Sequence, residues 1–100
     1  MPTYYHSTTD EGLEALTSGS AIRAGTFLSL VQEGSQQLPK RPHRLTIHIP
    51  ENAPIQLYWD WIHSTGRDTT FPGKFWDQWR VTTAPITDFT ITHIEDDPWA

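Results

Sequence analysis

Three short segments of the sequence combine side chains that could do chemistry. They are Tyr5-His6-Ser7-Thr8, Thr26-Phe27-Leu28-Ser29-Leu30 and Gln78-Trp79-Arg80-Val81. The first lies where an apolar N-terminal strand is expected to run into a helix, and a histidine at such a junction faces a cleft more naturally than a core. Imidazole and hydroxyl groups there can hydrogen-bond a polar ligand. We therefore expect a small binding cleft that is walled by His6 and by the second segment.

Other kinds of site have weaker sequence signals. The remaining histidines lack the His-x-x-x-His spacing of metal sites, so we expect no metal. Neither a Gly-x-x-x-x-Gly-Lys phosphate loop nor a Gly-x-Gly-x-x-Gly dinucleotide loop occurs. A serine, a histidine and Asp60 could assemble a hydrolytic triad, but no serine lies in a Gly-x-Ser-x-Gly elbow. The three segments therefore remain the main candidates.

Length, charge and composition limit the kinds of protein that this chain can be. One hundred residues suffice for one compact domain, residues 1–100, but not for two cores. No stretch approaches the ~20 apolar residues of a membrane span, and no secretory signal is apparent, so we expect a soluble protein. The absence of cysteine suits a reducing cytoplasm. The net charge of −5 argues against general nucleic-acid binding and is compatible with a basic protein partner.

The N-terminal part of the chain predicts a strand that is followed by one short helix. Tyr4 and Tyr5 begin the strand. Thr8 and Glu11 have the spacing of a capping box, in which hydroxyl and carboxylate satisfy each other's backbone donors. The helix should end near Ser18-Gly19, because glycine readily adopts the left-handed conformation that closes a helix.

The rest of the chain predicts mainly strands. Alternating or β-prone residues indicate strands at Thr26 to Val31, Arg44 to Ile49, Lys74 to Thr82 and Phe89 to Ile94. Glu33 to Pro42 and Ser64 to Gly73 have the composition of loops, and Ile55 to Ile62 favours a short helix or an irregular turn. Four of the five tryptophans lie in the second half, which we expect to supply most of the core. The predicted class is α+β with a largely antiparallel sheet.

The order of these segments resembles the ADP-ribosyltransferase family, whose fold occurs in diphtheria-type toxins, poly(ADP-ribose) polymerases and small phage and toxin–antitoxin enzymes. In that family a His-Gly-Thr or His-x-Thr motif ends the first strand, an aromatic-plus-serine segment follows the first helix, and a glutamate lies on a late strand. Tyr5-His6-Ser7-Thr8 looks like the first motif and Thr26-Phe27-Leu28-Ser29 like the second. Gln78-Trp79-Arg80-Val81, with the proline turn and last strand after it, is similar to the closing pattern.

The resemblance implies a single small ADP-ribosyltransferase-like domain that uses NAD as its cofactor. It implies that His6 hydrogen-bonds the adenosine-side ribose, that the backbone of Ser7 binds the nicotinamide amide and that Thr8 supports His6. Phe27 would stack on the nicotinamide ring, and Ser29 would order the cleft or contact the ribose. Each residue also has a plainer structural interpretation: His6 bonds to backbone, Phe27 belongs to the core, and Ser29 is a strand hydroxyl.

The family glutamate has no unambiguous counterpart in this sequence. Gln78 occupies its expected position, and Asp77 is the neighbouring acid. Glutamine can hydrogen-bond a ribose hydroxyl but carries no charge to stabilise an oxocarbenium ion, and Asp77 points to the opposite face of a regular strand. Either a bulge turns Asp77 toward the site, another acid such as Glu95 or Asp60 takes its place, or the site is catalytically weak.

Two functions follow from these residues and from the resemblance. One is a minimal NAD-dependent mono-ADP-ribosyltransferase that modifies a protein or nucleic-acid target, with His6, Gln78 and Asp77 as catalytic candidates. The alternative is a non-catalytic interaction protein on the same scaffold, such as a small acidic phage or toxin-system inhibitor that blocks a basic partner. The sequence sets neither the acceptor nor the oligomeric state.

Overall fold

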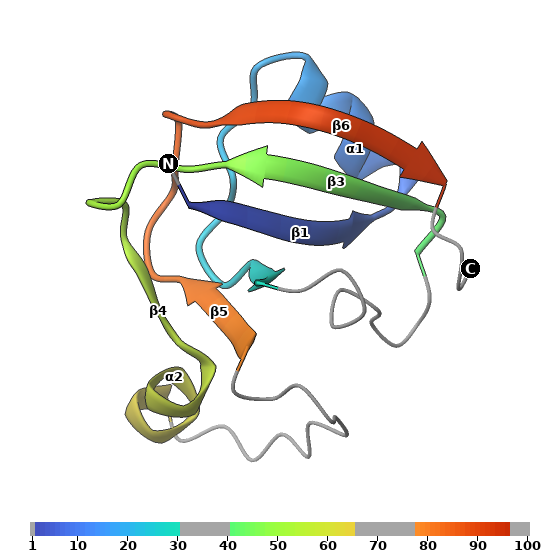
Figure 1. Cartoon of the computed structure of the whole chain (residues 1–100). Coiled ribbons are helices and arrows are strands. Elements are labelled where there is room, and N and C mark those ends of the chain that lie inside the picture. The colour runs from blue at the N-terminus through green and yellow to red at the C-terminus, as the bar shows by residue number, and fades with distance from the viewer. Residues whose placement is uncertain (1, 31–40, 66–77, 97–100) are drawn as a thin grey trace.

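A six-stranded antiparallel sheet with the order β4-β5-β2-β1-β3-β6 is the centre of the fold (Figure 1). We describe residues 2–30, 41–65 and 78–96 of a computed structural model of the chain. The elements are β1 (Thr3–Thr8), α1 (Asp10–Thr17), β2 (Phe27–Ser29), β3 (His43–His48), β4 (Ile55–Leu57), α2 (Tyr58–Thr65), β5 (Trp79–Thr82) and β6 (Thr90–Asp96). The predicted α+β class with an antiparallel sheet is confirmed.

The sheet consists of two groups of strands that are joined at one narrow place. In the first group β1 pairs with β3 at six positions, from Thr3↔His48 to Thr8↔His43, and β3 pairs with β6. In the second group β5 pairs with both β2 and β4. Between the groups, β1 and β2 are in register only at Tyr5↔Ser29. The two groups therefore diverge beside β1, where the sequence predicts a cleft.

Helix α1 begins one residue later than the predicted capping box requires. Its N-cap is Thr9, whose hydroxyl accepts a hydrogen bond from the Gly12 amide at 3.1 Å. Thr8 does not cap the helix, because it is still the last paired residue of β1, opposite His43. The C-terminal end is as predicted: Ser18 is the C-cap, and Gly19 follows with a φ of +100°.

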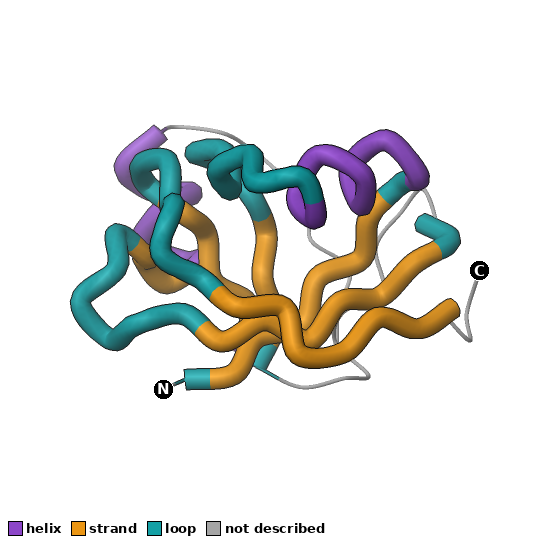
Figure 2. The backbone as a smooth tube through the Cα atoms, turned by 90° about the horizontal axis from the view of Figure 1, so that it is seen from above, coloured by secondary structure: helices purple, strands orange, loops and turns teal. Residues whose placement is uncertain are grey.

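Two hydrophobic clusters hold the elements together. The larger one is mainly aliphatic and includes Leu28, Leu45 and Ile47, with Leu13 and Leu16 of α1 packed against it. Figure 2 shows α1 lying over one face of the sheet. In the smaller cluster Tyr58, Trp79 and Val81 are buried, and Phe27, Trp61 and Ile62 pack against them.

The expectation that the tryptophan-rich second half supplies most of the core is only partly correct, because both halves contribute buried residues. Trp79 is buried, but the Trp59 side chain is 55% exposed. Trp76 lies outside the described residues. The larger cluster contains no tryptophan among the described residues, because the inward positions of β1, β2 and β3 already fill it with aliphatic side chains and Tyr4.

The strand β6 departs from the alternation that its sequence predicts. Ile94 pairs with Leu45, His93 with Thr46 and Ile91 with Ile47, so Thr92 is left without a partner in the ladder. This bulge shifts the register by one residue. As a result Ile91 and Ile94 project to the same face of the sheet instead of to opposite faces, and both line one groove.

Other boundaries also differ from the sequence prediction. Residues 55–62, expected to form a short helix or an irregular turn, form β4 and the start of α2. The strand predicted for residues 26–31 is shorter, and only part of the one predicted for residues 74–82 lies within the described ranges. Most of the two predicted loops lies outside the described residues. None of the helices in the described part of the chain is long and apolar enough to cross a membrane.

Candidate functional site

His6 makes a hydrogen bond that fixes both its orientation and its tautomer. Its Nδ1 atom lies 2.9 Å from the main-chain oxygen of Phe27. A carbonyl oxygen can only accept, so Nδ1 carries the proton and donates it. Burial lowers the pKa of His6 below its ordinary value; the bond to Phe27 opposes this effect, and the charge of Arg41 adds to it. The imidazole is therefore neutral at pH 7, and its Nε2 atom is a hydrogen-bond acceptor.

This histidine lies at the place where the two groups of strands separate. Tyr5 is the last residue of β1 that is in register with β2, at Ser29. One residue further on, the imidazole of His6 reaches Phe27 of β2 in place of a main-chain ladder bond. His6 thus connects the two groups of strands. Its imidazole is held by a main-chain oxygen, that of Phe27, and not by another side chain.

A pocket of about 380 Å³ lies beside His6, between α1, the end of β1 and the loop that precedes β2. Its polar lining comes from His6, Thr8, Thr9, Glu11, Ser20, Arg23 and Thr26. Apolar surface is added by Ala15 and Leu16 of α1 and by Ile22. Because Nδ1 is bonded to Phe27, Nε2 is the ring nitrogen that is left to accept a hydrogen bond from a ligand.

The floor of the pocket depends on a close approach between α1 and β1. A Cβ atom on Gly12 would overlap the hydroxyl group of Thr8, whose side chain is buried. Only glycine therefore allows the first turn of α1 to lie this close to the end of β1. The approach places Glu11 and Thr8 on the same pocket wall.

The other wall of the pocket is the loop of residues 23–26, which is hydrogen-bonded to Thr82 of β5. The hydroxyl of Thr82 donates to the Arg23 carbonyl at 2.6 Å and accepts from the Thr26 amide at 2.9 Å. Main-chain bonds join Gly25 N–H to the Thr82 oxygen at 2.7 Å and Thr82 N–H to the Thr26 oxygen at 3.0 Å. Gly25 turns the chain with a φ of +83°. These bonds hold the loop in one position, so that Arg23 and Thr26 face the pocket before any ligand arrives.

Two of the predicted site residues lie on the other face of the sheet from His6. Ser29 is directly opposite Tyr5, so it shares a face with Tyr5 and not with the neighbouring His6. Its side chain is 0% exposed. Phe27 lies two residues before Ser29 on β2, so its side chain projects to the same face as that of Ser29. The Phe27 ring makes edge-to-face contacts with Tyr58 and Trp61 at centroid distances of 5.7 and 5.4 Å.

The structure therefore brings together His6, Thr8 and the main chain of Phe27, but it does not bring the ring of Phe27 or the hydroxyl of Ser29 into the pocket. The contact between the first two motifs is made by a carbonyl group instead of an aromatic ring. Ser7 is buried, and binding by its backbone stays a prediction. So does stacking by Phe27.

Gln78, the catalytic candidate from the third segment, is not among the described residues that line the pocket. Gln78 immediately precedes β5, and its main-chain oxygen accepts from the Leu30 amide at 3.0 Å, which continues the pairing of β2 with β5. Asp77 lies outside the described residues. The catalytic roles of both residues stay predictions.

Several pocket residues were missed by sequence reasoning. Glu11 was assigned to helix capping, yet it is the only carboxylate among the described residues that line the pocket. Arg23 lies just before Ala24-Gly25, a turn signal that gives no hint of a cleft. Thr82 lies 59 positions from Arg23, and no local pattern predicts that bond.

Two other described histidines, His43 and His93, each lie close to one carboxylate. His43 Nε2 lies 2.5 Å from Asp10 Oδ1, and His93 Nε2 lies 3.7 Å from Glu95 Oε2. Within the described ranges no three histidine or carboxylate side chains gather as a metal site would require.

Comparisons of the chain with family models, curated proteins and solved structures found no match.

Proposed function

We propose that this chain is an ADP-ribosyltransferase-like protein that binds NAD in the pocket beside His6. The observation that carries the proposal is the hydrogen bond from His6 Nδ1 to the Phe27 carbonyl. Because this bond leaves Nε2 as a fixed acceptor, the imidazole is prepared to receive a hydroxyl donor. Ribose presents such hydroxyl groups, and the resemblance of Tyr5-His6-Ser7-Thr8 to the family's first motif assigns the same contact to this histidine.

The pocket fits one nucleoside portion of NAD better than the whole dinucleotide. Its volume of about 380 Å³ lies near the lower end of the ~300–1,000 Å³ that is usual for small-molecule sites. Ala15, Leu16 and Ile22 supply apolar surface for a base, while Ser20 and Thr26 supply hydroxyl groups. Arg23 is the one Lys or Arg among the described lining residues, and its guanidinium suits a pyrophosphate.

Transfer of ADP-ribose makes a further demand on the site. Positive charge develops on the ribose as the bond to nicotinamide breaks, so a negative group nearby stabilises the transition state. Gln78 cannot supply that charge. Under this proposal Glu11 joins Asp77 as a candidate for the acid, because Glu11 lines the pocket. The acceptor would be a macromolecule, most simply a basic protein given the net charge of −5.

A calorimetric titration with NAD tests the binding step. His6→Asn keeps an amide donor near the position of Nδ1 and removes the Nε2 acceptor, so it should preserve the Phe27 bond and weaken NAD binding about tenfold or more. His48→Asn is the matched control, because His48 is a partly exposed histidine of β3 that does not line the pocket. Unchanged binding by His6→Asn, or no binding by the wild-type protein, would overturn the proposal.

Incubation of the protein with labelled NAD and a cell lysate tests the transfer step. Release of nicotinamide together with label on a macromolecule supports the transferase, and Glu11→Gln should then reduce the rate at least tenfold while NAD still binds. Binding of NAD without any label transfer would instead favour the non-catalytic form of the protein.

A further inference from the structure

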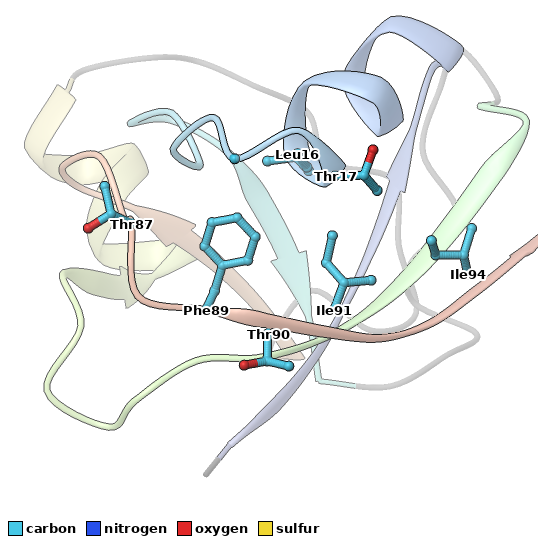
Figure 3. A pocket seen from close by; sticks show the side chains of 8 residues that line it. Leu16, Thr17, Thr87, Phe89, Thr90, Ile91 and Ile94 are labelled. Carbon is cyan, nitrogen blue, oxygen red and sulfur yellow. The ribbon is translucent and has the colours of Figure 1, made fainter.

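A second concave site lies between the C-terminal end of α1 and strand β6. It is a groove of about 450 Å³ whose apolar lining includes Leu16, Phe89, Ile91 and Ile94 (Figure 3). Figure 3 shows Ile91 on β6 projecting toward the end of α1, where Leu16 and Thr17 lie. Of the described lining residues, Leu16 is the one that the groove shares with the pocket beside His6. It is therefore a separate site, with no hydrogen-bonding histidine among its described lining residues.

The groove runs along β6, at the edge of the sheet that the described residues form. β6 is the outermost strand, and in the described part of the chain only β3 pairs with it. An edge strand presents main-chain N–H and C=O groups to which another strand can bond. The bulge at Thr92 usually discourages such pairing, but here it turns both isoleucines toward the groove. Ile94 is left 47% exposed, so apolar surface of the groove is open to a partner.

The charges around the groove select the kind of partner. Exposed acids lie at both ends of β6, at Asp88 and Asp96, and Glu14 lies one helical turn before Thr17 on α1. No lysine or arginine is among the described residues that line the groove. Arg44, the one buried lysine or arginine among the described residues, is paired with Glu95 at 2.7 Å. The groove therefore combines an apolar floor with acidic margins.

We propose that β6 and this groove bind an extended basic segment of a partner protein, which adds to the sheet as a seventh strand. Its aliphatic side chains would cover Ile91 and Ile94, and its lysine or arginine side chains would meet Asp88, Asp96 and Glu14. A second copy of this chain fits less well. If two β6 strands paired antiparallel about Thr92, Asp96 of one chain would lie near Asp88 of the other, and like charges would repel.

The test uses a synthetic nine-residue probe, acetyl-Thr-Lys-Val-Lys-Ile-Lys-Val-Lys-Thr-amide, labelled for fluorescence anisotropy. We expect it to bind the whole protein at low salt and to bind less tightly as salt is raised. The same peptide with glutamate in place of lysine should not bind. Two further versions of the peptide carry N-methyl groups on alternate amides. In one version the methyl groups block one edge of the strand, and in the other version they block the opposite edge. If the probe adds as a strand, one version should lose binding and the other should keep it.

Two matched variants of the protein locate the site. Ile94→Thr removes apolar surface from β6 and should weaken peptide binding about tenfold. Leu57→Thr makes a comparable change on β4 at the other edge, where Leu57 is 46% exposed, and should change binding less than twofold. The double variant Asp88→Asn with Asp96→Asn covers the case in which Ile94→Thr fails to fold, and it should weaken binding at least fivefold at low salt.

Equal effects of Ile94→Thr and Leu57→Thr, or full binding by both N-methylated peptides, would overturn the proposal. Dimerisation that Ile94→Thr abolishes, seen by analytical ultracentrifugation without peptide binding, would assign the groove to a second copy instead. His6→Asn should leave peptide binding unchanged, so failure of this proposal and failure of NAD binding are distinguishable.

Discussion

Replacement of Thr82 by valine tests whether the wall of the His6 pocket is held by one buried hydroxyl group. Valine keeps the shape and the β-propensity of threonine, so only the hydroxyl is lost. Thr82 is 1% exposed, and its hydroxyl both donates to the Arg23 carbonyl at 2.6 Å and accepts from the Thr26 amide at 2.9 Å. The change therefore removes two hydrogen bonds and leaves a partly buried amide without that acceptor.

The expected cost follows from those two bonds. Loss of the bond to the Arg23 carbonyl costs about 1 kcal/mol, and the Thr26 amide that loses its acceptor costs about 1–2 kcal/mol. We therefore expect the free energy of unfolding to fall by roughly 2–3 kcal/mol, with a melting temperature lower by about 10–20 °C for a domain of this size. NAD binding should weaken as well, because Arg23 and Thr26 would no longer be held toward the pocket.

Thr26→Val is the matched control for this prediction. The Thr26 hydroxyl also donates to the Arg23 carbonyl at 2.6 Å, but that bond is exposed and the hydroxyl accepts no bond among the described residues. Its loss should cost no more than about 1 kcal/mol. Urea unfolding measures both variants, provided that the slope with denaturant is unchanged. Equal destabilisation by the two variants, or a loss below about 0.5 kcal/mol for Thr82→Val, would refute the reasoning.

Three further predictions concern neighbouring parts of the site. Gly12→Ala should destabilise the protein by about 1–2 kcal/mol in urea unfolding, because the new methyl group overlaps the Thr8 hydroxyl. This loss should exceed the gain from the better helix propensity of alanine. A gain in stability would contradict the close approach of α1 to β1. Phe27→Leu should cost about 2–4 kcal/mol in thermal unfolding, because it removes three edge-to-face ring contacts, and a loss under 1 kcal/mol would argue against the cluster. Burial lowers the pKa of His6 in the folded protein. As the pH falls below about 6.5, the unfolded chain therefore binds more protons than the folded protein does. The free energy of unfolding should decrease there by at most about 1.4 kcal/mol per pH unit. His6→Asn should remove that part of the slope in urea unfolding at pH 7, 6 and 5, and identical slopes would count against the assignment.

The fold was predictable where the sequence pattern is strong and local. Leu45, Ile47 and Ile49 alternate with polar residues, and all three are fully buried on one side of β3. The end of α1 was predictable because Gly19 supplies the left-handed residue that closes a helix. The start was misplaced by one residue because Thr8 and Thr9 can both cap, and only the pairing of Thr8 with β3 decides between them.

The bulge in β6 was not predictable from its own residues. The sequence from Phe89 to Ile94 alternates in a way that fits a regular strand, and the register shift is set by pairing with β3. The same limit applies to residues 55–62, where β4 exists because it pairs with β5, a strand more than 20 positions away. Pairing partners far along the chain decide both cases.

Part of the candidate site could be inferred from the sequence. The junction of strand and helix correctly placed His6 beside a pocket and near the Phe27 segment. The nature of the contact could not be inferred, because a main-chain carbonyl carries no sequence signal. Because side chains alternate along a strand, Phe27 and Ser29 share one face of β2 and Leu28 projects to the other. Which of these two faces is shared with His6 depends on the register of β1 with β2.

The central claim is that His6 is a neutral imidazole with its proton on Nδ1 and its Nε2 atom open to NAD. Nitrogen-15 NMR of the histidine rings tests it most directly, with His48 as an internal reference in the same sample. We predict that at pH 7 the Nδ1 resonance of His6 has the shift of a protonated nitrogen and Nε2 that of an unprotonated one, and that added NAD moves the Nε2 resonance of His6 but not that of His48. A charged His6 ring, a proton on Nε2, or spectra that do not change with NAD would contradict the account.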